Sequence, residues 1–418
     1  MTTRFHSSLG RARRMLLLAL APVLVNGCTE LTEIPKDALT PDNAFKTEEE
    51  ILAGVASVYA GLRGMMWGYY NLSEITTDEL VVPTRGSDWY DNGRWLEIHR
   101  QAWAPNSGSA LDDMNGTWND LFVGVARSNL MISVMEQSTS AQRDVVIAEL
   151  RTLRAWFYYM LQDMFGGVPL VTTTEVQQRP RATRAEIFSF IESELNETRT
   201  VLPDAWPAGQ YGRMTAGAAN AILASLYLNA GVFARDNGVS ATSYNSCSTV
   251  PGACQNAIDA ANRVINSGDY AMAANWSDNF STTNESSPEN IFVLAHTSQP
   301  GLGMSIQMRG LHYNQLVPSP WNGFATLAET YRSFNPADQR RNVFLIGQQF
   351  SYNTGAAVQD RNGAPLIFTD TNPNIESAWE AEGARLMKFP PLPGAPAGDA
   401  HPNDFTFFRL AEMYLIRA

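Results

Sequence analysis

Adjacent acidic residues are the first candidates for chemistry in this sequence. Two carboxyl groups held about 5 to 9 Å apart can hydrolyse a glycosidic bond, with one of them acting as the acid. Asp78-Glu79 and Asp112-Asp113 qualify by residue type. Neighbouring acids are more often solvated loop charges or helix caps, so glycoside hydrolysis stands only as the enzyme hypothesis.

Other catalytic centres and metal sites lack the residues that they require. No helix could present two histidines to zinc, because none lies three or four positions from another; they are His6, His99, His296, His312 and His401. The sequence has no Gly-x-Ser-x-Gly elbow and no phosphate-binding Gly-Lys pair. We therefore predict no catalytic residue, no metal and no cofactor.

The segment from Gly64 to Trp103 combines ring and polar side chains in the way that carbohydrate sites do. Aromatic rings offer large, rigid contact faces, and a few placed polar groups fix a ligand's orientation. The rings are Trp67, Tyr69, Tyr70, Trp89, Tyr90, Trp95 and Trp103, interleaved with Arg85, Asp88, Asp91, Asn92, Arg94 and Glu97. The other interpretation, a minor core beneath a long loop, remains open.

We expect these rings to divide between the two roles. Trp67 and Trp103 are expected to be structural, whereas Trp89, Tyr90 and Trp95 are expected to be exposed. The predicted ligand-binding set is Trp89, Tyr90, Asn92, Arg94 and Trp95, together with Tyr313 and Trp321 later in the chain.

Composition limits the classes of partner. The 418 residues carry 30 basic and 42 acidic side chains, a formal charge of -12, which argues against nucleic acid because phosphates need neutralising. With 44% hydrophobic and 10% aromatic residues the chain can bury a core, which excludes global disorder.

The first 27 residues are predicted to be a signal peptide. Basic residues from Arg4 to Arg14 precede the apolar run 15–25, which is too short to span a bilayer. The run ends in Val25-Asn26-Gly27-Cys28, which resembles the lipobox of bacterial lipoproteins. That resemblance implies cleavage before Cys28, a lipid on its thiol and a tether over 28–45, with acyl chains anchoring the protein to a membrane. An ordinary secretory signal with a chance cysteine is the alternative.

The other two cysteines, Cys247 and Cys254, are predicted to form a disulfide. Pro251-Gly252 between them favours a turn, and an exported chain meets an oxidising compartment. A metal site would need more ligands than two thiols.

Helical patterns dominate the region 46–418, which we interpret as one domain. Thr47 and Glu50 form a capping-box pattern before apolar residues spaced by three and four. A loop is expected from about 64 to 116. Further helices are predicted from Trp118 onward and over 143–165, 183–200, 215–231, 257–265 and 405–418.

The predicted fold is mostly α. Helices that come in pairs suggest tetratricopeptide-like hairpin repeats, with a closed helical toroid as the alternative. Turn residues multiply from about 270 to 400, where a strand over 291–294 is plausible. The pattern stops inside a helix at Ala418, which suggests that the natural protein continues.

Several segments together resemble the SusD/RagB-like nutrient-binding outer-membrane lipoproteins. The most recognisable block is 150–159 followed by 165–170, and the next is 212–215 with the alanine-rich helix ending at 226–228. Shorter matches lie at 76–79, 88–91, 317–319, 338–340 and 408–418, and Glu30 and Glu33 follow the lipobox cysteine as in that family.

This resemblance implies four tetratricopeptide-like helix pairs that carry a loop-rich ligand-binding half. It also implies a lipid-anchored protein of the cell outer membrane, facing outward, that forms a lid over a SusC-type TonB-dependent transporter. Such a lid captures an oligosaccharide or a peptide and does no chemistry on it. A surface glycoside hydrolase and a scaffold that binds only protein are the competing hypotheses.

Overall fold

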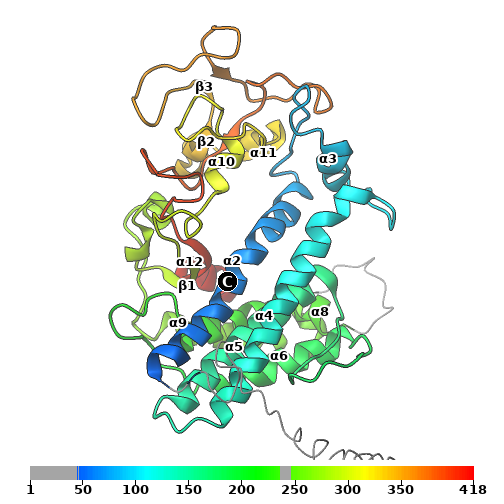
Figure 1. Ribbon diagram of the computed structural model, residues 1–418, viewed down its shortest axis with the longest axis vertical. Coiled ribbons are helices and arrows are strands. Elements are labelled where there is room, and N and C mark those ends of the chain that lie inside the picture. The colour runs from blue at the N-terminus through cyan, green and yellow to red at the C-terminus, as the bar shows by residue number, and fades with distance from the viewer. Residues whose placement is uncertain (1–44, 46, 236–245) are drawn as a thin grey trace, which may run out of the picture. The chain divides into compact units, whose positions relative to one another are not determined.

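The computed structural model describes residues 45, 47–235 and 246–418 (Figure 1). By its contacts, Thr47–Ala418 forms one compact unit. The predicted signal peptide, Cys28 and the tether up to residue 44 lie outside the described residues. Among the residues described, no helix is both long and apolar enough to cross a membrane.

Helix α2 spans Glu48–Ile75 and begins at the predicted capping box. The Thr47 hydroxyl accepts a hydrogen bond from the Glu50 amide at 3.2 Å, and the Glu50 carboxylate accepts one from the Thr47 amide at 3.1 Å. The loop expected from residue 64 was wrong for 64–75, which stays helical. Helix packing overrides the unfavourable glycines there, since a Cβ at Gly68 would lie 2.0 Å from the Thr117 hydroxyl of α4 (Asp112–Glu136).

Helix α5 spans Arg143–Phe165, which confirms the strongest helix predicted. It ends at Gly166, whose φ of 79° suits glycine. A Cβ at Gly124 of α4 would lie 2.5 Å from the Phe157 ring, so this glycine lets α4 and α5 approach closely.

The remaining long helices continue the pattern of hairpins. Helix α6 (Arg184–Thr198) begins at the predicted Thr183–Glu186 capping box, and the alanine-rich prediction over 215–231 divides at Asn229 into α7 (Ala216–Leu228) and α8 (Ala230–Phe233). Helix α9 (Ala253–Ile265) begins four residues earlier than expected, beside the disulfide between Cys247 and Cys254, whose Cα atoms are 5.1 Å apart.

Successive helices pack on one another in chain order. α2 lies on α4, α4 on α5, α5 on α6, α6 on α7, α7 on α9, and α9 on α12 (Leu410–Arg417). The fold is therefore mostly helical and made of stacked hairpins, as predicted. Figure 1 shows α2 and α4 rising side by side toward the loop-rich half.

The predicted helix over 405–418 was wrong in its first five residues. Phe405–Arg409 is strand β6, paired antiparallel with the predicted strand β1 (Asn290–Leu294). The rings of Phe292 and Phe407 stack at 4.9 Å. Cross-strand aromatic packing stabilises a strand, and it overrides the helical pattern that resumes at Leu410.

The loop-rich half contains short elements between turns. The helices are α3 (Arg94–His99), α10 (Ile306–Gly310) and α11 (Ala328–Ser333), and the two-residue strands pair as β2 (Phe344–Leu345) with β5 (Arg385–Leu386) and β3 (Gly347–Gln348) with β4 (Ile367–Phe368). The 3-10 turns are Asp91–Gly93, Gly108–Leu111, Cys247–Thr249, Trp276–Phe280, Asn284–Ser286 and Gln339–Val343.

Two buried arginines hold this half together. Arg85 donates to the carbonyls of Asn322 and Glu382, each at 3.1 Å, and Arg385 donates to the Glu380 carbonyl at 2.9 Å and to the Asn322 side-chain oxygen at 3.1 Å. Each guanidinium thereby satisfies backbone groups that turns leave unpaired.

Candidate functional site

An open hollow in the loop-rich half collects four tryptophans and a few polar side chains. We call it the tryptophan hollow; it has a volume of about 490 Å³ and is lined by Trp67, Trp89, Asp91, Asn92, Arg94, Trp95, Ser109 and Trp321. The residues come from α2, from α3 and the turn that leads into it, from the 3-10 turn at 108–111, and from the segment after α10.

The indole rings of the hollow are held at fixed distances. The ring centroids of Trp67 and Trp321 are 5.9 Å apart with planes tilted by 57°. The Trp89 indole donates a hydrogen bond to the Trp321 carbonyl at 2.7 Å, which joins two segments far apart in sequence. Trp67 keeps 41% of its surface exposed, so its ring can receive a ligand.

A strained turn presents the polar groups. Trp89, Asp91 and Asn92 have positive φ angles of 60°, 40° and 57°, which residues with a side chain rarely adopt. The Trp95 indole donates to the Asp91 carboxylate at 2.6 Å, and the Ser109 hydroxyl donates to the Asp91 carbonyl at 3.1 Å. Strain that surrounding contacts maintain is common at ligand sites.

Beneath the hollow lies an aromatic base. Trp89 contacts Trp95 at 5.3 Å and Phe324 at 5.9 Å between ring centroids, and Trp95 contacts Phe324 at 6.0 Å. Only glycine fits at position 323, since a Cβ there would lie 2.4 Å from the Trp89 ring. The base therefore determines where the Trp89 ring stands.

Two guanidinium groups support the rings. Arg94 forms an ion pair with the buried carboxylate of Asp113 at 2.6 Å and lies 4.7 Å from the Trp95 ring centre. Arg309 is buried 4.3 Å from the Trp67 ring centre and donates to the Asn71 side chain at 2.8 Å. Burial lowers the pKa of Arg309 to about 10, so it stays charged at neutral pH and adds a cation–π contact.

The structure brings five of the seven predicted ligand-binding residues into the hollow: Trp89, Asn92, Arg94, Trp95 and Trp321. Tyr90 is 56% exposed but does not line it. Tyr313 also stands outside its lining and donates a hydrogen bond to the Asp88 carboxylate at 2.5 Å. Burial and the Asp88 charge raise the pKa of Tyr313 to about 12.

The expected division of the rings was wrong at Trp95, Trp67 and Trp103, and Trp89, which was expected to be exposed, is half-buried. Trp95 was expected to be exposed, yet only 3% of its surface is, because it packs under Trp89. Trp67 and Trp103 were expected to be structural, yet they are 41% and 38% exposed. Trp67 is the lining ring that the sequence argument missed. Spacing gave no signal for it, because a residue three positions from the buried Tyr70 on α2 is expected on the same face.

The adjacent acids of the enzyme hypothesis have structural contacts. Asp113 is buried in the first turn of α4, where it pairs with Arg94 and accepts a hydrogen bond from Asn71 at 3.3 Å. Asp112 beside it is mostly exposed and lies 4.0 Å from Arg94. Across the part of the chain that the structure describes, no group of three or more His, Cys, Asp or Glu residues could hold a metal ion.

Sequence comparison finds relatives of one kind. Residues 39–228 match a SusD-like family model described as starch-binding and associating with the outer membrane. SusD-like protein P2 of Formosa agariphila is 26% identical over 222 residues, which are 50% of this chain and 41% of that protein. The starch-binding protein SusD of Bacteroides thetaiotaomicron is 27% identical over 166 residues, 39% of this chain and 28% of that protein. The matches thus cover less than half of these relatives.

Solved structures share the fold over most of the chain. A SusD superfamily protein from Parabacteroides distasonis has a TM-score of 0.69 at 17% identity, covering 91% of this chain and 76% of that one. Surface glycan-binding protein A from Bacteroides thetaiotaomicron, in complex with laminarihexaose, has a TM-score of 0.67 at 18% identity, covering 88% and 78%. A laminarin-binding SusD-like protein has a TM-score of 0.66 at 22% identity, covering 89% and 80%. The chain therefore resembles SusD-like proteins in the sequence of residues 39–228, and it shares the fold of the solved SusD-like structures over most of its length.

Proposed function

We propose that the tryptophan hollow binds an oligosaccharide and that the protein delivers it, without chemistry, to a SusC-type TonB-dependent transporter. The observation that carries the proposal is the pair of indole rings of Trp67 and Trp321, tilted by 57° in an open hollow. Two rings at an angle follow a curved chain of sugars better than a flat surface would. A family description that names starch and relatives that bind glycans support the same ligand class.

The polar groups of the hollow suit a ligand covered with hydroxyls. Asn92 is exposed at the rim, and its side-chain amide forms no hydrogen bond with the residues that the structure describes, so it can donate and accept toward sugar hydroxyls. Arg94 and Asp91 are held by Asp113 and Trp95, and we assign them to positioning the turn. This combination of stacking faces and few polar contacts gives orientation without catalysis.

Isothermal titration of the purified protein against a panel of glycans, with laminarihexaose included, tests the ligand class. We expect binding of at least one glycan, with about tenfold lower affinity after Asn92→Ala, a loss of about 1.4 kcal/mol. If peptides bound tightly and no glycan bound, the ligand would be a peptide and not an oligosaccharide. Release of reducing ends during incubation would support the hydrolase hypothesis instead.

We also propose that the protein is anchored to the outer membrane, facing outward, through a lipid on Cys28. Radioactive palmitate should label the expressed protein and should not label the Cys28→Ala variant. Co-purification of the labelled protein with a barrel transporter would support delivery. Absence of label in the wild-type protein would contradict the anchor while leaving the glycan site untouched.

A further inference from the structure

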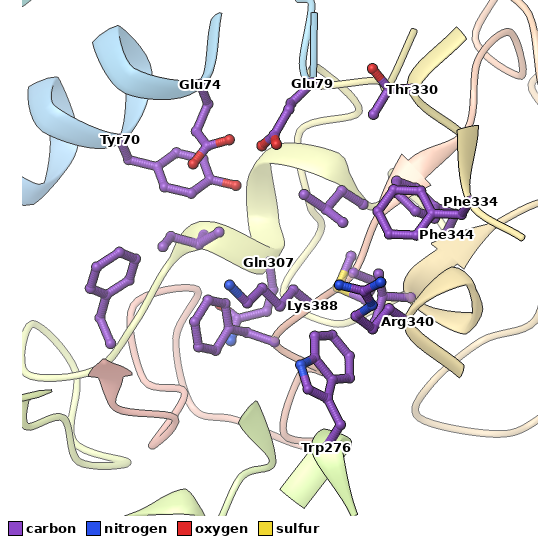
Figure 2. A pocket seen from close by; sticks show the side chains of 16 residues that line it. Tyr70, Glu74, Glu79, Trp276, Gln307, Thr330, Phe334, Arg340, Phe344 and Lys388 are labelled. Carbon is purple, nitrogen blue, oxygen red and sulfur yellow. The ribbon is translucent and has the colours of Figure 1, made fainter. Parts of the chain in front are cut away.

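A second cavity lies on the same helix as the tryptophan hollow and differs from it in chemistry. Its volume is about 230 Å³, and it opens between the C-terminal turn of α2, the 3-10 turn at 339–343 and residues 386–389 (Figure 2). Since one water occupies roughly 30 Å³ of liquid, the space suits one small molecule. We call it the glutamate cavity, after Glu74 and Glu79 in its wall.

Most of the wall of the glutamate cavity is aromatic. Its rings belong to Tyr70, Trp276, Phe334, Phe344, Phe389 and Phe405. The rings of Phe389 and Phe405 are stacked at 5.9 Å, which makes a continuous apolar face. A ligand must therefore carry an apolar body to replace water favourably here.

Two carboxylates stand together on the opposite wall. Figure 2 shows Glu74 and Glu79 on the same side of the cavity, above Lys388. Neither carboxylate is in an ion pair with the basic groups that the structure describes. Burial, and then the charge and hydrogen bond of Glu79, raise the pKa of Glu74 to about 7. The Glu74 carboxyl is thus about half protonated at neutral pH, first because it is buried and then because the Glu79 carboxylate is close.

The basic residues of the cavity balance this negative charge only in part: the charge of Lys388 lowers the pKa of Glu74, but burial and Glu79 outweigh it. Arg340 is already paired with Asp338 at 2.6 Å. The Lys388 ammonium lies 4.6 Å from the ring centre of Phe280, and burial lowers its pKa. Gln307 adds a buried side-chain oxygen with no hydrogen-bond partner among the described residues. The cavity therefore contains one lysine against two carboxylates, beside aromatic rings that attract cations.

We propose that the glutamate cavity binds a small organic amine, with its ammonium group between Glu74 and Glu79 and its apolar body on the rings. An ammonium group supplies three donors to the carboxylates and replaces the proton that they share. This site and its ligand class go beyond glycan capture, and neither depends on the tryptophan hollow.

Three probes that share a phenylethyl body but differ in the charge of their polar group test the ligand class. Titrating the purified protein at pH 8, we expect 2-phenylethylamine to bind at least tenfold more tightly than 2-phenylethanol or 3-phenylpropanoate. Equal affinity for the amine and the alcohol, or preference for the carboxylate, would overturn the proposal. A lack of glycan binding in the same protein would affect only the function proposed for the tryptophan hollow.

Two substitutions with opposite expected effects test the placement of the ammonium group. Glu74→Gln should weaken binding of 2-phenylethylamine at least tenfold, whereas Lys388→Met should tighten it several-fold because a competing cation is removed. Glu49→Gln, an exposed carboxylate in the first turn of α2, is the matched control and should leave amine binding unchanged. With circular dichroism showing folded variants, unchanged affinity after Glu74→Gln, or weaker binding after Lys388→Met, would refute the assignment.

Proton release gives an independent readout. The titratable and charged groups around Glu74 are Glu79, Lys388, Tyr69, Tyr70 and Arg340. A bound ammonium group favours the ionised form of Glu74. Affinity should therefore rise about tenfold from pH 6 to pH 8 as the proton leaves Glu74. Titrations in buffers of different ionisation enthalpy should show the released proton, and affinity that is constant over this range would contradict the mechanism.

Discussion

Trp67 and Trp95 both line the tryptophan hollow, but their indole rings have different roles. Trp67 stands on α2 with a large exposed face, whereas Trp95 of α3 is buried beneath Trp89. Residue type and spacing could not separate them, because exposure depends on which neighbours the fold places above each ring.

Alanine at Trp67 and at Trp95 should therefore give opposite phenotypes. Trp67→Ala removes a stacking face, so we expect about tenfold weaker glycan binding with the free energy of unfolding changed by less than about 1 kcal/mol. Trp95→Ala leaves a cavity in the aromatic base and should cost about 3–5 kcal/mol. Calorimetric titration and urea unfolding measure the two effects. If the Trp95→Ala variant were as stable as the wild-type protein, the Trp95 ring would not contribute to the core.

The close contact at Gly323 provides a second prediction at this scale. Gly323→Ala places a Cβ against the Trp89 ring, 2.4 Å from its nearest atom, and should displace the ring and weaken glycan binding several-fold. Gly116→Ala in α4 is the matched control, since nothing lies within 4 Å of the added carbon. It should leave binding unchanged and stabilise the helix by about 0.5–1 kcal/mol. Equal glycan affinity in both variants would show that the ring need not stay in place.

At the scale of elements, charged groups join α5 to α6. The Arg154 guanidinium pairs with the buried Glu194 carboxylate at 2.6 Å, and Arg151 pairs with both Glu194 and the exposed Glu197. Thr152 and Thr198 add a buried hydrogen bond of 2.8 Å. The interface between these helices therefore depends on groups that are costly to leave unpaired.

Neutralising the two glutamates in turn tests that dependence. Glu194→Gln leaves Arg154 buried without a counter-charge, and we expect it to lower the free energy of unfolding by about 3 kcal/mol. Glu197→Gln removes only an exposed partner and should cost less than about 1 kcal/mol. Urea unfolding of both variants measures the difference. Similar losses would mean that burial of Glu194 carries no special penalty.

At the scale of the whole molecule, this acidic chain buries some of its carboxyl groups, and burial raises their pKa values. Burial raises the pKa of Glu412 on α12 to about 7, although Arg409 acts in the opposite direction. Burial likewise raises the pKa of Asp404 to about 6. Burial lowers the pKa values of His296 and His401 to about 4, and their stabilising effect is lost as the pH falls toward that value.

Below about pH 6.5 the histidines oppose the acids, so these shifts predict that stability falls as the pH rises from about 6.5 to 7.5. The folded protein retains protons on the buried acids that the unfolded chain has already released, so raising the pH favours unfolding. Glu412→Gln should flatten this fall in a plot of melting temperature against pH and leave the acidic limb unchanged. The remaining slope belongs to Asp404 and Glu74, whose pKa values are also raised. An unaltered slope in the variant would show that Glu412 titrates normally.

Local patterns in the sequence were enough to predict the helical half. The capping boxes at Thr47 and Thr183 and the apolar stripe of 143–165 act within a few turns of the chain, so their helices could be read directly. The errors occurred where contacts between residues far apart in the sequence determine the secondary structure. Residues 64–75 remain helical because α4 packs on them, and 405–409 form a strand because β1 lies alongside.

By itself the sequence determined the helical hairpins and most of the aromatic and polar residues that gather in the tryptophan hollow. Only the tertiary structure decided which rings face outward. Trp321 lies more than two hundred residues along the chain from α2 and from the turn at 89–93, and only folding brings these three together. Glu79 and Tyr70 of the glutamate cavity stood out in the sequence, but nothing there indicated that they meet Glu74 and Lys388 around one cavity. Burial and the nearby charge of Glu79 give Glu74 its chemistry, and both arise only when the chain is folded.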